Sequence, residues 1–353
     1  DGVIEPSEWE NATAIPVIIE NNGIRVTDTI SYLYLMYDNK NLFVSLLSPI
    51  PAMALADPHG KLLYGFFKRD VLGHDESVDL DDALEINIVK PGTGGENFYR
   101  MVSNTIDTTY DYIVRPDKTI ELLWSPGWEV KSSISEDGWS FEARIPFAGL
   151  ESDIPKKGDM WHANFHRIWK QLKSQTDSWA VGKRNPETSN LEKFSAGTLI
   201  FGDNETISVG KLVLDGLTKL MPKISFQLYN HSNKPRDIQI KIATEKDVFA
   251  TQKVKVEANG RYPFEWDRDL SEMFPTELSI IITDNITKQT IYSLYIPLFT
   301  KKLVEVNMRS YPSLNLAKIE GDISALDVCN VLRLYGIDCD RDALWYIWLH
   351  CGF

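Results

Sequence analysis

The sequence predicts an all-β protein with two β-sandwich domains and a short, partly helical C-terminal tail. Apolar and polar residues alternate with a period of two over much of residues 30–300. Turns rich in Asn, Asp, Gly and Pro separate these alternating segments, and no long stretch of helical periodicity occurs among them. Many short strands with frequent turns are typical of antiparallel sandwiches.

The first predicted domain covers residues 1–203 and is built around three hairpins. In segment 139–146, Trp139 and Phe141 fall on one face and Glu142 on the other, as in a half-buried antiparallel strand. Pro146 ends that strand because proline cannot donate to a ladder. The predicted hairpins are 32–37 with 42–48, 83–89 with 98–104, and 128–134 with 139–146; segments 160–168 and 196–202 are further strands.

The second predicted domain covers residues 204–300, and its rhythm of strands and turns predicts a small immunoglobulin-like sandwich. Residues 301–353 form the tail, in which 324–336 has helical periodicity and Gly336 suits a C-cap. The predicted strands of the second domain are 223–230, 237–244, 252–257, 277–284 and 290–297.

Charge and motifs exclude several classes of protein. The 353 residues carry a formal net charge of −13, so no basic field exists to displace counterions from nucleic-acid phosphates. No apolar run approaches the roughly twenty residues of a membrane span. Nucleophile elbows, Walker loops and HExxH motifs are absent, which predicts a non-catalytic chain. Cysteine occurs only at positions 329, 339 and 351, so the sequence predicts no disulfide framework in the two main domains.

Six segments of the first domain resemble the family 9 carbohydrate-binding modules. The match is strongest in DGWSFEARIPFAGL (137–150), which resembles a Gly-Trp-x-x-Glu-x-x-Ile-Pro-Phe segment of that family. The segments appear in the family's order along residues 1–203. They are 1–12, 34–46, 81–88, 137–150, 158–167 and 194–201.

This resemblance implies a β-sandwich that binds sugar chains, often at chain ends, and that usually carries structural calcium. Family members are typically appended to secreted glycoside hydrolases and are not catalytic themselves. The chain begins at Asp1 with no basic or apolar leader, so we expect any signal peptide to have been removed or not included. We therefore expect a secreted or cell-surface protein whose partner is a polysaccharide or other glycan.

Candidate sugar-binding residues follow from alternation and from the resemblance. Leu84 and Ile86 take the core face of their strand, so Glu85 points the other way, and the hairpin brings Arg100 and Asn104 toward it. An ordinary cross-strand ion pair and a turn cap are the alternative interpretations of these three polar residues. The resemblance adds the polar position Arg167 and the aromatic position Trp179, and Trp169 is a further candidate aromatic residue.

The sequence departs from the family at the first stacking tryptophan. Segment 64–80, where that residue belongs, contains none, and the available substitutes are Tyr64, Phe66 and Phe67. Because stacking on sugar faces supplies much of the affinity of such sites, this departure bears directly on sugar binding.

The acidic run 74–82 predicts a structural calcium site. Calcium takes six to eight oxygen ligands, which a carboxylate-rich loop can supply, although a solvated acidic loop is the alternative. His162 and His166 share a face of one strand. We interpret them as surface or packing residues rather than as a zinc-binding pair. The predicted calcium ligands are Asp75, Glu76, Asp79 and Asp81.

Two functions remain open at this stage. The first is non-catalytic polysaccharide binding, as an accessory region of a glycoside hydrolase. The second is a cell-surface structural or assembly role, in which residues 320–353 contact a partner or a second copy. Segment 320–336 faintly resembles one half of a dockerin, with Leu316 and Lys318 at early calcium-ligand positions, where they cannot bind the ion.

Overall fold

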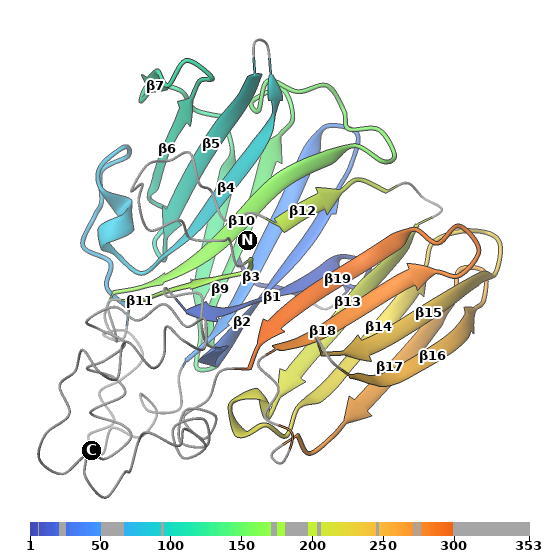
Figure 1. Ribbon diagram of the computed structural model, residues 1–353. Helices are drawn as coiled ribbons and strands as arrows, with labels where there is room; N and C mark the ends of the chain where they lie inside the picture. The colour runs from blue at the N-terminus through green and yellow to red at the C-terminus, as the bar shows by residue number, and fades with distance from the viewer. Residues whose placement is uncertain are drawn as a thin grey trace, which may run out of the picture.

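The computed structural model describes residues 1–5, 7–20, 26–50, 67–92, 95–170, 175–180, 197–202, 206–244, 247–270, 273 and 277–298. The predicted tail 301–353 and the aromatic residues Tyr64 and Phe66 lie outside this part of the chain. Within it the fold is all-β, as predicted, and every strand pairing is antiparallel (Figure 1). None of its helices is long or apolar enough to cross a membrane.

The first unit is a single 12-stranded sheet with the order β7-β6-β5-β4-β10-β11-β1-β2-β3-β9-β8, and β12 pairs with β10 beside β11. The predicted hairpins are confirmed as β2–β3, β4–β5 and β8–β9. The strands are β1 (Thr13–Glu20), β2 (Val26–Tyr37), β3 (Asn41–Pro49), β4 (Ala83–Gly92), β5 (Gly95–Asn104), β6 (Thr109–Val114), β7 (Ile120–Glu121), β8 (Glu129–Ile134), β9 (Gly138–Pro146), β10 (Met160–Trp169), β11 (Gln175–Ser178) and β12 (Gly197–Ile200).

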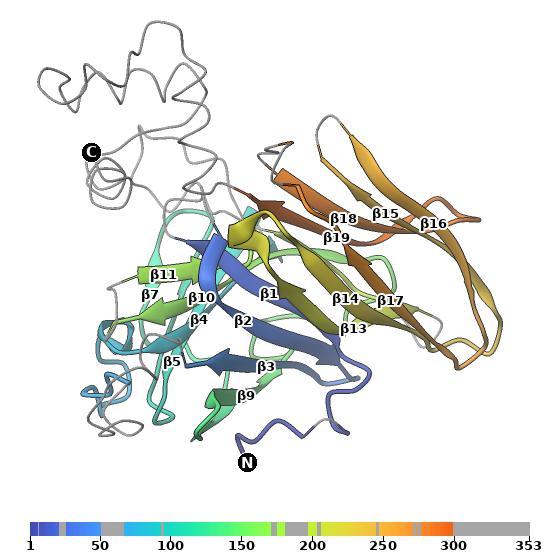
Figure 2. The same cartoon turned by 90° about the horizontal axis from the view of Figure 1, so that it is seen from below.

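This sheet folds over on itself to make two layers with a core between them. Strands β9 and β10 are far apart in the strand order, yet the Arg167 guanidinium lies 4.7 Å from the Trp139 ring centroid. Figures 1 and 2 show β4, β5 and β10 in one layer and β2, β3 and β9 in the other. Trp139 and Phe141 are fully buried between the layers, which confirms the face predicted for them.

The tight entry into β9 requires glycine. Gly138 has φ of +147°, and a Cβ built there would lie 2.3 Å from the Ser48 carbonyl oxygen on β3. A side chain at this position would collide with backbone that the β3–β9 ladder holds in place. This glycine therefore fixes the register of β9, and with it the inward face of Trp139.

The second unit is a two-sheet sandwich. A 3-stranded sheet has the order β13-β14-β17, and a 4-stranded sheet has the order β16-β15-β18-β19. The five predicted strands correspond to β14, β15, β16, β18 and β19, whereas β13 and β17 were not predicted. The strands are β13 (Ile207–Asp215), β14 (Lys223–Asn230), β15 (Arg236–Ala243), β16 (Val248–Val256), β17 (Arg261–Asp267), β18 (Glu277–Asp284) and β19 (Thr290–Pro297). Its immunoglobulin-like character and the domain boundaries stay predictions.

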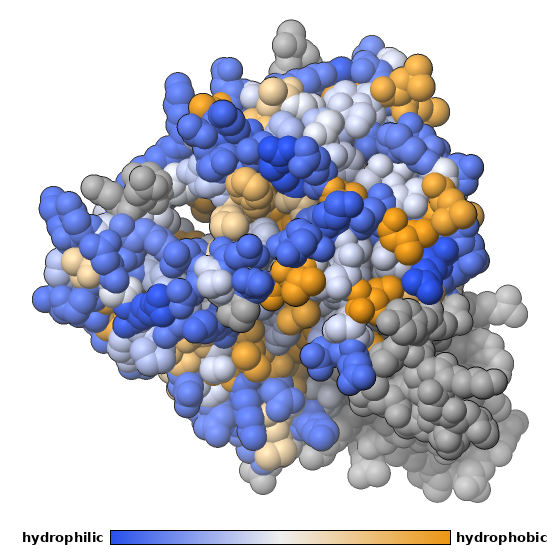
Figure 3. Space-filling model, turned by 180° about the vertical axis from the view of Figure 1, so that it is seen from behind, coloured by the Kyte–Doolittle hydropathy of each residue, from blue (hydrophilic) through white to orange (hydrophobic). Residues whose placement is uncertain are grey.

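The two units share one apolar core. Buried residues of β1 and β2 belong to the same hydrophobic cluster as buried residues of β13 and β19. The hydroxyl of Tyr292 donates to the Ala14 carbonyl at 3.1 Å, and the amide of Leu214 donates to the Tyr32 hydroxyl at 2.9 Å. Seen from behind, the surface is mostly hydrophilic, with apolar residues in separate groups (Figure 3).

Candidate functional site

A polar cluster lies on the outer face of the β4–β5–β6–β10 layer, with an ion pair at its centre. Leu84 and Ile86 point into the core, so Glu85 between them points outward, as predicted. The guanidinium Nη2 of Arg100 donates to the Glu85 carboxylate at 2.7 Å, and the two side chains are 18% and 15% exposed. Glu85 and Arg100 therefore converge as predicted, and their contact is the cross-strand ion pair that was the alternative interpretation of these residues.

Two tyrosines of β6 hold the Arg100 guanidinium from the neighbouring strand. Its central carbon lies 6.0 Å from the Tyr110 ring centroid and 5.6 Å from the Tyr112 ring centroid. Asp79 approaches the same guanidinium at 3.5 Å. Both tyrosines lie opposite β5 residues of the outer face, Tyr112 opposite Arg100 itself. The arrangement presents aromatic rings and planar charged groups side by side.

His166 completes the cluster from β10, directly opposite Glu85 in the ladder. Its Nδ1 lies 2.8 Å from the Ser178 hydroxyl. Burial lowers the pKa of His166, and the facing Glu85 carboxylate only partly offsets this. Burial also acts to raise the pKa of Glu85, but the charges of His166 and Arg100 and the Asn87 amide hydrogen bond outweigh it, so that pKa lies below its ordinary value.

Acid is expected to destabilise the protein through His166. A histidine with a depressed folded-state pKa is protonated first in the unfolded chain, so stability falls as pH drops below about 6.5. Glu85 contributes in the same direction, but only below its unfolded pKa, near pH 4.3. Between pH 7.5 and 5.5, His166→Gln should remove up to about 1.4 kcal/mol of the pH dependence. Urea midpoints of both proteins at the two pH values measure this; an unchanged dependence would show that His166 does not titrate in this way.

Trp179 lies on the opposite face from this ion pair, which separates it from Glu85 and Arg100. Its ring packs against inward-facing Phe165 at 5.7 Å between centroids, and its amide donates to the Phe165 carbonyl. A Cβ at Gly197 would lie 2.4 Å from the indole, so β12 approaches Trp179 closely. The indole therefore packs at the edge of the sandwich and is only partly buried.

Arg167 and Trp169 lie inside the sandwich, contrary to the positions expected from the resemblance. Arg167 is 0% exposed, and its guanidinium is 3.8 Å from the Trp169 ring centroid. Trp169 is 3% exposed and donates its indole N–H to Asp177 at 2.8 Å. Phe67, one of the substitutes considered for the missing tryptophan, is also buried and lies 5.9 Å from the same guanidinium. These side chains stabilise the core, because none of them reaches the surface.

Asn104 shares the outer face of β5 but is completely buried under the loop before β4. Its amide nitrogen donates to the Val71 carbonyl and to Asp81, each at 3.0 Å. Its side-chain oxygen accepts from the Ile106 and Thr108 amides, as expected of a residue that caps a turn. The structure thus supports the turn-cap interpretation of Asn104.

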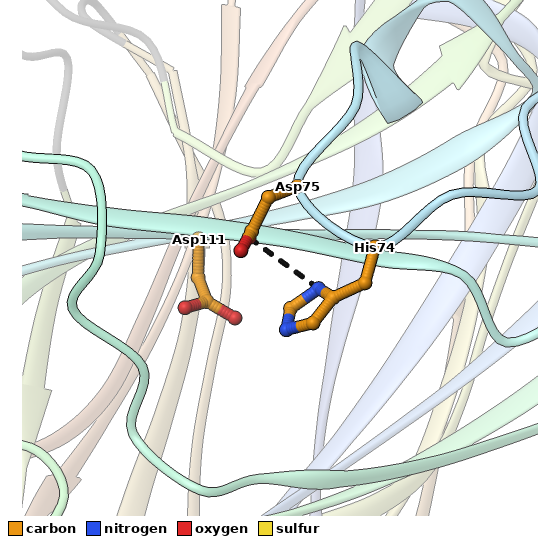
Figure 4. Close-up of side chains that lie close together, drawn as sticks. All are labelled: His74, Asp75 and Asp111. Atoms are coloured by element: carbon orange, nitrogen blue, oxygen red, sulfur yellow. Dashed lines mark ion pairs between the residues drawn. The ribbon is translucent and has the colours of Figure 1, made fainter.

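The four predicted calcium ligands do not converge. Asp81 is buried and accepts from the amides of Asp70 and Val71 and from Asn104, so it organises the loop. Asp79, on the 3-10 turn η1 (Val78–Leu80), faces Arg100. Asp75 alone belongs to a group of possible metal ligands, with His74 and Asp111 (Figure 4). Glu76 is exposed and is not part of that group.

Sequence reasoning missed Tyr110, Tyr112 and His166 as members of the outer-face cluster. Strand β6 is only six residues long, and the segment TYDYIV was not predicted as a strand. The signal was present nonetheless, because Tyr110 and Tyr112 are two residues apart and follow the second strand of a predicted hairpin. Alternation along that segment places both rings on one face.

Comparison with known proteins finds similarity only among solved structures. No family model and no curated protein matches the sequence. A provisionally assigned carbohydrate-binding protein from Bacteroides uniformis aligns at 16% identity over 56% of this chain and 90% of its own, with a TM-score of 0.42. A family 9 carbohydrate-binding module from Caldicellulosiruptor kristjanssonii, in complex with cellotriose, aligns at 18% identity over 57% of this chain and 88% of its own, with a TM-score of 0.35. Similarities of this size carry no conclusion about the ligand of this chain.

Proposed function

We propose that this chain binds carbohydrate, without catalysis, through the outer face of β4, β5 and β6. The observation that carries the proposal is the Glu85–Arg100 ion pair set beside the rings of Tyr110 and Tyr112. A sugar ring has apolar C–H faces that pack on aromatic rings, and vicinal hydroxyls that match carboxylate and guanidinium groups. The ordered resemblance of residues 1–203 to family 9 modules supports the same function.

Each polar group of this face has a defined role in the proposal. The Glu85 carboxylate accepts from sugar hydroxyls, and the Arg100 guanidinium donates to them, because an arginine fork has five donors and Glu85 uses only part of them. Tyr110 remains partly exposed beside them, so its ring offers a surface for a sugar C–H face. The ion pair is pre-assembled, which reduces the ordering cost of binding.

The finer parts of the proposal concern ligand size and setting. We propose a polysaccharide as the ligand, and a secreted protein that acts as an accessory region beside a glycoside hydrolase. These features follow from the family resemblance, and the binding test below distinguishes polymers from free sugars.

Glu85→Gln and Tyr110→Ala are expected to weaken polysaccharide binding. A hydrogen bond to a charged group contributes about 1.5–3 kcal/mol, which corresponds to roughly a 10- to 150-fold loss of affinity. Affinity electrophoresis in gels containing cellulose derivatives, β-glucan, xylan or mannan measures retardation, and calorimetry with matching oligosaccharides gives Kd.

Glu129→Gln is the matched control, because Glu129 pairs with Arg144 across β8 and β9, away from the proposed face. It should bind as the unaltered protein does. Retardation by a polysaccharide that survives both Glu85→Gln and Tyr110→Ala would move the site elsewhere. No retardation by any polymer or oligosaccharide would reject carbohydrate binding.

A further inference from the structure

A second cluster of polar side chains lies where the loop before β4 meets β6. His74 and Asp75 come from the loop and Asp111 from the strand, and one ligand atom from each lies within 4.8 Å of the others. Nδ1 of His74 is 3.3 Å from Asp75 Oδ1, and these two side chains are 57% and 42% exposed. Figure 4 shows the three side chains converging, with the imidazole directed toward the Asp111 carboxylate.

Asp111 supplies an independent indication that this cluster holds a ligand. It is 0% exposed, and its Oδ2 accepts from the indole N–H of Trp128 at 3.0 Å. Its Oδ1 has no hydrogen bond of ordinary geometry, although the Ser125 hydroxyl lies near enough to favour the charged carboxylate. A buried carboxylate oxygen without a partner is costly, and such groups in native proteins are explained by an ion, a water or a bound proton.

The histidine is oriented as metal-binding histidines are. Nδ1 of His74 lies 2.8 Å from the Thr109 carbonyl oxygen, which can only accept, so Nδ1 carries the proton. Nε2 therefore keeps its lone pair, and it is the ring nitrogen on the side of Asp111 (Figure 4). A histidine that donates its second nitrogen to a carbonyl is the usual outer-shell arrangement at metal sites.

We propose that His74, Asp75 and Asp111 bind a divalent metal ion of the zinc class. One imidazole and two carboxylates match the ligands of zinc and its first-row neighbours, whereas calcium prefers six to eight oxygen ligands. Atoms that each lie about 2.0–2.2 Å from zinc are closer to one another than 4.8 Å, so the side chains must move together to bind the ion. The exposed side chains of His74 and Asp75 have the rotamer freedom to do so.

Such an ion would join the loop to the β6 strand. Because Trp128, the residue before β8, donates to Asp111, the ion would also connect the loop to the start of β8. Asp75 already contacts β6 through its amide, which donates to the Thr109 carbonyl at 3.0 Å. The metal would neutralise the facing carboxylates of Asp75 and Asp111 and satisfy the unpaired Oδ1. Asp111 lies between Tyr110 and Tyr112 on β6, but it is opposite the core residue Met101 and so points to the other face of the strand from Arg100. The inference therefore does not depend on the proposed function.

The test uses the full chain without a histidine tag, stripped with a chelator and titrated calorimetrically with zinc chloride. We expect one zinc ion per chain and a rise in the thermal midpoint on zinc addition. Loss of an outer-shell partner alone weakens metal affinity roughly 10- to 100-fold, so His74→Ala and Asp111→Asn should each weaken binding at least as much. His162→Ala is the matched control, because His162 is an exposed histidine of β10 outside the cluster, and it should leave binding unchanged.

Three results would overturn the proposal. The first is no zinc binding, and the second is binding that survives His74→Ala. The third is calcium binding more tightly than zinc, which would indicate an oxygen-ligand site instead. If the unaltered protein binds no zinc, the first of these results, the stability of Asp111→Asn shows what satisfies Oδ1 instead. A variant as stable as the unaltered protein would indicate a bound proton, since burial raises the pKa of Asp111 against the opposing Trp128 hydrogen bond.

Discussion

Arg167→Met is expected to lower the free energy of unfolding by about 3–5 kcal/mol, because it leaves a buried carboxylate without its counter-ion. Arg167 is 0% exposed, and its guanidinium lies 3.4 Å from Asp82, which is 1% exposed. Its Nε donates to the Ser48 hydroxyl on β3 at 2.9 Å, so the side chain bridges the two layers of the sandwich. Burial lowers the pKa of Arg167 to about 10, which leaves it charged at neutral pH.

Urea denaturation of Arg167→Met, Asp82→Asn and the double variant measures the coupling between the two residues. The double variant should be less destabilised than the sum of the single variants, because it removes both charges. Arg167→Lys should also destabilise, since an ammonium replaces the planar fork between the Trp139 and Trp169 rings. Arg144→Met, at an exposed ion pair on β9, is the control and should change stability by less than about 1 kcal/mol. A value that small for Arg167→Met would contradict a structural role for the buried pair.

The buried position of Arg167 follows from the alternation of residues along β10, although a charged residue is usually expected at the surface. Trp161, Phe165 and Trp169 occupy the same face of β10 as Arg167, and all of them are buried. Strict alternation therefore places Arg167 inside the sandwich, whereas its charge and the family resemblance suggested a surface position. The same rule correctly placed Glu85 outward, because the residues on either side of it are apolar.

Proline explains two of the strands that were not predicted. β17 contains Pro263 and pairs only with β14, so it is an edge strand, where a missing amide donor is tolerated. β1 contains Pro16 and pairs along its length with β2, while β11 joins it only at Ile19 and Glu20. A sequence pattern cannot tell which strands become edges, because that depends on the tertiary arrangement.

Only the part of the outer-face cluster that depends on local pairing could be predicted from the sequence. Glu85 and Arg100 lie on two strands joined by a short turn, so their pairing follows from local register. His166 reaches the same cluster from β10, far away in sequence, and only the pairing of β10 with β4 brings it there. The position of Trp179 likewise depends on how β11 and β12 meet β10, which no local pattern specifies.

Tyr292→Ala is expected to destabilise both units together by about 3–5 kcal/mol, because it removes a large buried ring from their shared core. The Tyr292 side chain is 8% exposed, and its hydroxyl donates to the Ala14 carbonyl of β1. Burial raises the pKa of this tyrosine, in agreement with an apolar setting. A surface contact between independent domains would not produce a loss of this size.

Calorimetry of the full chain distinguishes one cooperative unit from two. With a shared core, the unaltered protein should unfold in a single transition that Tyr292→Ala shifts as a whole. Tyr295→Ala is the matched control, because Tyr295 lies three residues further along β19 and is 44% exposed, and we expect a small effect. If Tyr292→Ala instead separates the transition into two, with only the later one shifted, the second unit folds independently and serves as a spacer. If Tyr292→Ala shifts a single transition, the two units fold together. The sheet that carries the Glu85–Arg100 face is then stabilised by both units, since its strand β1 packs in the shared core and links β11 to β2.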